Sequence, residues 1–110
     1  MEPMPVQSDV YRIGNDTNSQ TITLNKKYED DSNVVFTNTS DEGFFVVVGT
    51  GTSAPTAVYA NSATTPVQGV EIPAGFVLTY KINSQVTFFA AIQETAGTKG
   101  GLSIKIGEGV

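Results

Sequence analysis

Apolar and polar residues alternate with a period of two along most of this 110-residue chain, and this alternation restricts its fold more than any other feature. In the segment 76-FVLTYKI-82, one face carries apolar or aromatic side chains: Phe76, Leu78, Tyr80 and Ile82. The opposite face carries Val77, Thr79 and Lys81. A β-strand with one face on a core and the other in water has this pattern, and helical periodicity is nearly absent. We therefore expect an all-β protein.

Clusters of Gly, Asn, Asp and Ser separate the alternating segments into about eight short strands. The expected strands are residues 20–26, 33–38, 43–49, 56–60, 67–72, 75–82, 85–92 and 101–106, with a weaker ninth at 9–13. Short strands divided by regular turn signals are typical of a sandwich or barrel. Since a chain of this length forms one domain, we expect a single antiparallel β-sandwich over residues 20–110.

The first 19 residues differ in composition from the rest, and we interpret residues 1–19 as an extended N-terminal arm. Pro3 and Pro5 cannot donate hydrogen bonds to a β-ladder and disfavour a helix. Loop-forming residues occupy 14–19, and the apolar side chains between the two parts have no helical spacing. A frayed terminus has a similar composition, so both interpretations stay open.

Cysteine, histidine and tryptophan are absent from the chain. Without cysteine there is neither a disulfide framework nor a thiolate metal site, and the redox compartment stays undetermined. Without histidine there is no Ser-His-Asp or Cys-His pair, and no general base that titrates near neutral pH by default. We therefore expect a protein that is not an enzyme and that needs no cofactor.

The net charge of −5 lies entirely in residues 1–42, because residues 43–110 carry equal numbers of cations and anions. Binding to the phosphate backbone needs a basic face, and the acidic balance of the chain argues against it, so we expect no nucleic-acid partner. No apolar run approaches the length of a membrane span, so we expect no membrane partner. The start of the chain lacks the features of a secretory signal, so synthesis in the cytoplasm without Sec-type export is expected.

The segment 42-EGFFVVVGTGTSAP-55 resembles the entrance to a phosphate site, because an apolar strand runs into Gly-Thr-Gly-Thr. A phosphate loop needs a helix N-terminus behind its glycines, so that free N–H groups meet the anion. The residues that follow are β-like, and no lysine stands at the Walker position. We therefore interpret 44–48 as a strand buried on both faces and 49–52 as a connection.

Two groups of acidic residues deserve comparison with known sites. The turn 28-YEDDSN-33 offers enough oxygen atoms to bind Ca²⁺, but it lacks the alternating spacing and central glycine of an EF-hand loop. Asp41 and Glu42 are neighbours in a turn and not a facing pair of the kind that glycoside hydrolysis requires. Solvated turns account for both groups, and whether residues 29–33 bind Ca²⁺ stays open.

The segment 50–69 carries almost no charge and is rich in Thr, Ser and Ala. Surfaces of this composition suit flat protein–protein contacts or strand addition better than capture of small molecules. The residues expected to form a protein-contact loop are Thr50, Thr52, Ser53 and Tyr59.

Several motifs together resemble a family of bacteriophage proteins. They are 34-VVFTNTS-40, 44-FFVVVGTG-51, 71-EIPAGFVLTY-80, 85-QVTFFAAI-92 and 101-GLSIKIGEGV-110. Small β proteins encoded in the head-gene clusters of tailed phages are similar in this succession, in particular the staple-like cement proteins of short-tailed phages. These are capsid decoration proteins with jelly-roll-like sandwiches, and the resemblance covers residues 33–110.

The resemblance implies a structural virion protein on the outer surface of the capsid. Such a protein would bind the major capsid protein across capsomer boundaries and hold the shell against the pressure of packaged DNA. Because a staple across a twofold boundary favours isologous pairs, a homodimer is expected. The arm lies outside the resemblance, and its apolar residues suggest capsid docking. The expected contact residues are Met4, Val6, Val10, Tyr11 and Arg12.

A second hypothesis comes from a different class of protein. A tail-fibre or receptor-binding module could hold carbohydrate in the loops at 49–56 or 61–69. A carbohydrate site usually presents an exposed aromatic platform beside carboxylates, and Tyr59 is the best candidate for that platform.

Overall fold

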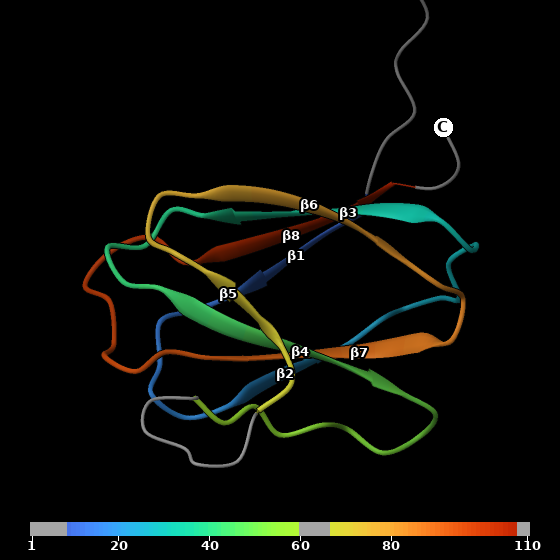
Figure 1. Ribbon diagram of the computed structural model, residues 1–110, viewed down its shortest axis with the longest axis horizontal. Helices are drawn as coiled ribbons and strands as arrows, with labels where there is room; N and C mark the ends of the chain where they lie inside the picture. Colours follow the sequence, from blue (N-terminus) through green and yellow to red (C-terminus); the bar gives the residue numbers. More distant parts are fainter. Residues whose placement is uncertain (1–8, 60–66, 108–110) are drawn as a thin grey trace, which may run out of the picture.

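Two four-stranded antiparallel sheets make up the computed structural model, which describes residues 9–59 and 67–107 (Figure 1). The first sheet has the strand order β1 (Asp9–Ile13), β8 (Leu102–Gly107), β3 (Ser32–Asn38), β6 (Val77–Ile82). The second has the order β2 (Gln20–Thr23), β7 (Val86–Ile92), β4 (Phe44–Thr50), β5 (Val70–Ile72). Within these described ranges there is no helix. The predicted all-β sandwich is confirmed.

The strands pair in a nested order. The first strand pairs with the eighth, the second with the seventh, the third with the sixth and the fourth with the fifth. Every connection except the one between β4 and β5 passes from one sheet to the other. The connections β1–β2, β3–β4, β5–β6 and β7–β8 therefore gather at one end of the sandwich, on the left in Figure 1, and β2–β3 and β6–β7 lie at the opposite end.

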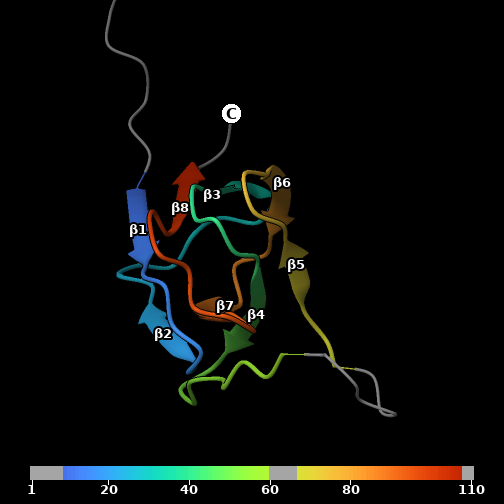
Figure 2. The ribbon, with the colours of Figure 1, turned by 90° about the vertical axis from the view of Figure 1, so that its left-hand side faces the viewer.

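The core fills the space between the two sheets, which Figure 2 shows as separate layers. Phe36 of β3 and Phe89 of β7 meet edge to face across it, with 5.7 Å between their ring centroids. The inward positions of the alternating strands supply the fully buried side chains around them, such as Val34, Phe44 and Ile104. Each aliphatic or aromatic side chain of this kind contributes about 1.5–3 kcal/mol by leaving water.

The expected strands 33–38, 43–49, 85–92 and 101–106 are confirmed to within one residue at each end. The strands expected at 20–26, 67–72 and 75–82 are present but shorter. The last of these starts late because residues 73–76 form a turn. In this turn the Phe76 amide donates to the Pro73 carbonyl, and Gly75 has a φ of 77°.

The strand expected at 56–60 is wrong for its described part, residues 56–59. This segment is irregular because backbone atoms in and beside it form hydrogen bonds with side chains instead of with a neighbouring strand. The Ala57 amide donates to Ser19 Oγ at 2.9 Å, and Thr21 Oγ1 donates to the Pro55 carbonyl at 3.2 Å. A short alternation of apolar and polar residues therefore does not indicate a strand at this place.

The N-terminal segment also differs from the expected arm. Residues 9–13 form β1, which pairs with β8 along its whole length, so the weaker ninth strand is confirmed. Its last residue, Ile13, is only 3% exposed and belongs to the core. Residues 14–19 connect β1 to β2 within the sandwich. The described part of the segment 1–19 therefore belongs to the domain, and residues 1–8 lie outside the described residues.

Candidate functional site

The outer face of the second sheet is covered by the chain's own segment 51–59. Phe45 and Ala90 point outward from this sheet, yet they are 7% and 0% exposed. Ala57 of the covering segment is 2% exposed, and the ring of Tyr59 lies 5.9 Å from that of Phe45. Figures 1 and 2 show this segment running beneath the lower sheet. We call it the covering segment, and it gives the second sheet a small outer core.

The residues of the predicted protein-contact loop have two different roles. Thr50, Thr52 and Ser53 are exposed at the end of β4 and in the turn after it. Tyr59 instead belongs to the covering segment, and its hydroxyl donates to Glu71 Oε1 at 2.9 Å. Partial burial, followed by the hydrogen bond and charge of Glu71, raises the pKa of Tyr59 to about 12. The loop is therefore exposed only in its first part.

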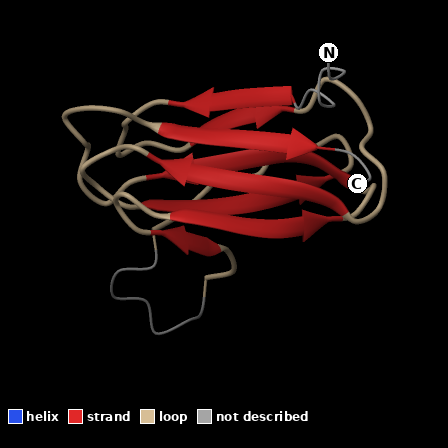
Figure 3. Ribbon diagram, turned by 90° about the horizontal axis from the view of Figure 1, so that it is seen from above, coloured by secondary structure: helices blue, strands red, loops and turns tan. Residues whose placement is uncertain are grey.

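Within residues 9–59 and 67–107, no segment covers the outer face of the first sheet in this way, and we call that face the bare face. Val10 of β1 is 56% exposed and Val77 of β6 is 58% exposed. Figure 3 looks onto this sheet from above, with connections at the two ends of its strands. Its outward side chains combine valines, hydroxyl residues, an asparagine and cations: Val10, Arg12, Asn33, Val35, Thr37, Val77, Thr79, Lys81, Ser103 and Lys105.

The residues predicted to bind from the arm are therefore divided among three places. Val10 and Arg12 lie on the bare face, because they alternate with inward residues of β1. Tyr11 points inward and packs against the core. Met4 and Val6 lie outside the described residues. The structure thus brings two of the five predicted residues together on one surface.

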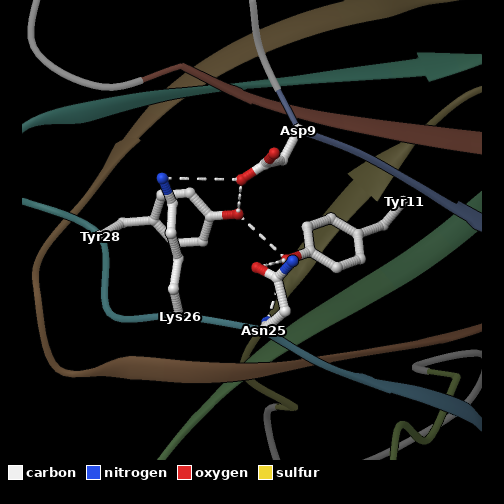
Figure 4. A network of polar contacts seen from close by, with 5 residues as sticks. All are labelled: Asp9, Tyr11, Asn25, Lys26 and Tyr28. Atoms are coloured by element: carbon white, nitrogen blue, oxygen red, sulfur yellow. Dashed lines mark hydrogen bonds and ion pairs between the residues drawn. The ribbon is translucent and has the colours of Figure 1, made fainter.

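Tyr11 takes part in a polar cluster that joins β1 to the β2–β3 connection (Figure 4). Its hydroxyl donates to Asn25 Oδ1 at 2.8 Å and accepts from the backbone N–H of Asn25 at 3.1 Å. Tyr28 is 1% exposed, and its hydroxyl donates to Asp9 Oδ2 at 2.7 Å. Lys26 Nζ lies 3.8 Å from the same carboxylate oxygen and 5.1 Å from the centre of the Tyr28 ring.

The hydrogen bonds of this cluster connect the first strand to the β2–β3 connection. Burial raises the pKa of Tyr28 well above its usual range, and the hydrogen bonds with Tyr11 and Asp9 act in the same direction. The phenol of Tyr28 therefore stays protonated at neutral pH. Its role is to hold the β2–β3 connection against the first strand.

A second polar cluster fixes the connections at the opposite end. Gln93 is 1% exposed, and its Nε2 donates to Asn15 Oδ1 at 2.9 Å and to Ser40 Oγ at 3.2 Å. Its Oε1 accepts from the amides of Asp16 and Gly97 at 2.9 and 3.2 Å. Sequence reasoning missed this residue, although it follows Phe89 and Ala91 at the next inward-facing position after β7. A polar side chain at an inward position is the signal that could have found it.

A cleft of about 280 Å³ opens between the two sheets where β6 faces β4 and β5. Val48 and Tyr80 line it and are 53% and 40% exposed. The remaining lining is mostly apolar: Val34, Phe36, Val46, Gly69, Val70, Ile82, Val86 and Phe89, with Lys81 and Asn83. The size of this cleft falls just below the usual range for sites of drug-sized ligands, about 300–1,000 Å³.

Hydrogen bonds within the acidic turn at 29–33 and to the β6–β7 connection hold this turn. Asp30 Oδ1 accepts from the Ser84 amide at 2.7 Å, and this bond lowers the pKa of Asp30. Within residues 9–59 and 67–107, no group of three or more His, Cys, Asp or Glu side chains could hold a metal ion. The same residues include no helix with the length and hydropathy needed to cross a membrane.

Comparisons of this chain with models of protein families, with curated proteins and with solved structures found no match.

Proposed function

We propose that this chain is a structural virion protein, a capsid decoration or cement protein. In this role it binds the outer surface of a phage head, contacts neighbouring major-capsid subunits and stabilises the shell against the pressure of packaged DNA. One observation carries the proposal: segment 51–59 covers the outer face of one sheet, and among the described residues no segment covers the outer face of the other. A flat exposed surface with scattered valines suits contact with another protein.

The nested strand pairing supports this proposal. A sandwich of eight strands that pair first with last and fourth with fifth fits the double Greek-key arrangement of jelly rolls, which occur in viral capsid proteins and lectins. Four of the motifs that carry the phage resemblance overlap β3, β4, β7 and β8. Because one fold hosts many functions, the proposal depends on the bare face more than on the topology.

The proposed mechanism needs no large interface. A shell presents the same binding position many times, so a modest contact per copy adds up when one decoration protein bridges two subunits. The partners are the major capsid protein and a second copy of this chain, and the proposal assigns no chemical reaction and no cofactor. Its location is the outer surface of the virion.

The carbohydrate-binding alternative draws no specific support from the geometry. Tyr59 was its best aromatic platform, but the ring packs against Phe45 and the hydroxyl is bound to Glu71. Residues 61–66 of the second candidate loop lie outside the described residues.

Fractionation of purified phage particles tests the proposal. We expect the chain to sediment with intact heads and to be accessible to antibodies on them. Heads assembled without the protein should release their DNA at a lower temperature, and the purified protein added afterwards should restore the wild-type value. Intact heads that lack the chain would contradict the proposal, as would heads whose DNA retention does not depend on it.

A further inference from the structure

The cations of this acidic protein are unevenly distributed over its surface. Three of its six Lys and Arg residues lie on the bare face: Arg12 on β1, Lys105 on β8 and Lys81 on β6. The described acidic residues lie in connections, on the second sheet or in the polar cluster around Tyr11 and Tyr28: Asp9, Asp16, Glu29, Asp30, Asp31, Asp41, Glu42, Glu71 and Glu94. The outward positions of the first sheet therefore carry positive charge only.

The strand register places these cations on a diagonal across the sheet. Lys105 pairs with Val10 on one side and with Val35 on the other. Arg12 pairs with Ser103, so it is a diagonal neighbour of Lys105, about 7–8 Å away between Cα atoms. Lys81 lies two strands further across the same face. Between the cations are exposed valines and hydroxyl groups that a flat partner can contact.

Two of these cations have no polar partner among the residues that the structure describes. Arg12 and Lys105 form no hydrogen bond or ion pair with any residue in the ranges 9–59 and 67–107. Lys81 is partly engaged, since its Nζ donates to the Asp31 carbonyl and to Asn33 Oδ1. The guanidinium of Arg12 and the ammonium of Lys105 are therefore available to carboxylates of another molecule.

We infer that the bare face is the docking surface of this protein and that its partner there is an acidic protein surface. The valines supply apolar contact, and Arg12 on the edge strand and Lys105 on an inner strand pair with carboxylates of the partner. The net charge of −5 would repel an acidic partner elsewhere, so the positive face also sets the orientation of approach. The identification of this partner with the outside of a phage head rests on the proposed function.

Two other occupants fit the charges less well. A second copy of the chain, docked through the same face about a twofold axis, would bring the same cations towards one another. The expected homodimer therefore uses another surface. Nucleic acid needs a continuous basic footprint, whereas this face combines three cations with valines and belongs to an acidic protein.

Charge reversal on this face tests the inference in heads purified without the protein. The double variant Arg12→Glu/Lys105→Glu is compared with Lys27→Glu/Lys99→Glu, which makes the same change in net charge in two connections away from the face. We expect the first variant to bind heads about tenfold more weakly or worse, since two attractive exposed pairs are each replaced by repulsion. The control should bind within about threefold of the wild type. Circular dichroism checks that both variants fold.

A second experiment tests the face without phage heads. Poly-L-glutamate is titrated into the isotopically labelled protein at low salt, and the amide signals are followed by NMR. We expect the largest shifts at β1 and β8, around Val10, Arg12, Ser103 and Lys105. They should disappear in Arg12→Glu/Lys105→Glu. A short DNA duplex serves as the competing polyanion and should cause smaller shifts at these residues.

The two experiments separate the inference from the proposed function. If the wild type binds heads and the face variant binds equally well, the inference is wrong and the proposed function stands. If the wild type does not bind heads but poly-L-glutamate shifts the face residues, the proposed function is wrong and the inference is supported. Stronger shifts with DNA than with poly-L-glutamate would overturn the acidic-protein partner. Shifts that are absent from the face would contradict the docking surface itself.

Discussion

The outer faces of the two sheets differ in composition and in what covers them. The second sheet carries large or apolar side chains outward, among them Phe45 and Ala90, and segment 51–59 covers them. The first sheet carries valines, hydroxyl residues and cations outward, and these side chains are exposed or half-buried. Segment 51–59 therefore covers the face whose large apolar side chains would be unfavourable in water. The other face consists of side chains that can remain in contact with water.

This difference can be read from the strands themselves. In β7 the run Phe88-Phe89-Ala90-Ala91-Ile92 is apolar on both faces, which indicates a strand covered on both sides. In β8, Ser103 and Lys105 alternate with core residues, which indicates a strand with one face in water. From this difference between the two faces we derive predictions about stability and ionisation on the covered face.

The largest expected effect is the loss of Phe45. The variant Phe45→Ala should lower the free energy of unfolding by about 3 kcal/mol, because it opens a cavity beneath Tyr59 and the covering segment. Val77→Ala on the bare face should cost at most about 1 kcal/mol, mostly through lower strand propensity. Urea unfolding monitored by circular dichroism measures both values.

Phe76→Ala provides the matched control for this first prediction, because the same atoms are removed from a side chain that is 53% exposed. Its cost should be close to that of Val77→Ala. Equal losses for Phe45→Ala and Phe76→Ala would show that the covering segment contributes little to stability.

The contact between Gly49 and Pro55 offers a smaller, more local test of the cover. A Cβ atom at position 49 would lie 2.7 Å from Pro55 Cδ and 2.9 Å from Pro55 Cγ. Gly49→Ala must therefore displace the covering segment and should destabilise the protein by about 1–3 kcal/mol. Thermal unfolding of the variant measures this cost.

Gly14→Ala is the control for the second prediction, since a Cβ atom at that position meets nothing within 4 Å. The double variant Gly49→Ala/Pro55→Ala should recover part of the loss, because it removes the ring atoms that the new methyl group meets. Additive costs for the two substitutions would reject this explanation.

The sequence predicted the sandwich well, because alternation specifies which side chains face inward and turn clusters specify where strands end. The strand predicted at 56–60 is wrong for residues 56–59, since the alternation is short and the backbone of this segment bonds to the side chains of Ser19 and Thr21. The arm interpretation missed β1, whose partner β8 lies at the other end of the chain.

The candidate site was harder to predict for a similar reason. Val10 and Arg12 were predicted as contact residues, but Lys81 and Lys105, which share their face, come from strands about 70 and 90 residues further along the chain. Strand order and register decide which of these side chains share a face, and neither can be read from one strand alone. The arrangement of cations on the bare face therefore became visible only with the sheet.

The smallest expected effect concerns the pKa of Tyr59, which reports how tightly the covering segment is held. Its phenol should titrate near 12 instead of at the ordinary 10.0, and the difference in ultraviolet absorbance between wild type and Tyr59→Phe isolates it. Since the folded state holds this proton more tightly than the unfolded state, its contribution to stability is complete below pH 10 and is lost as the pH rises towards 12. Glu71→Gln should lower the pKa of Tyr59 part of the way towards 10.0, because burial, the larger cause, remains.

A Tyr59 that titrates at 10 in the wild type would mean that the covering segment lies open to water. The contrast between a covered and a bare face would then fail.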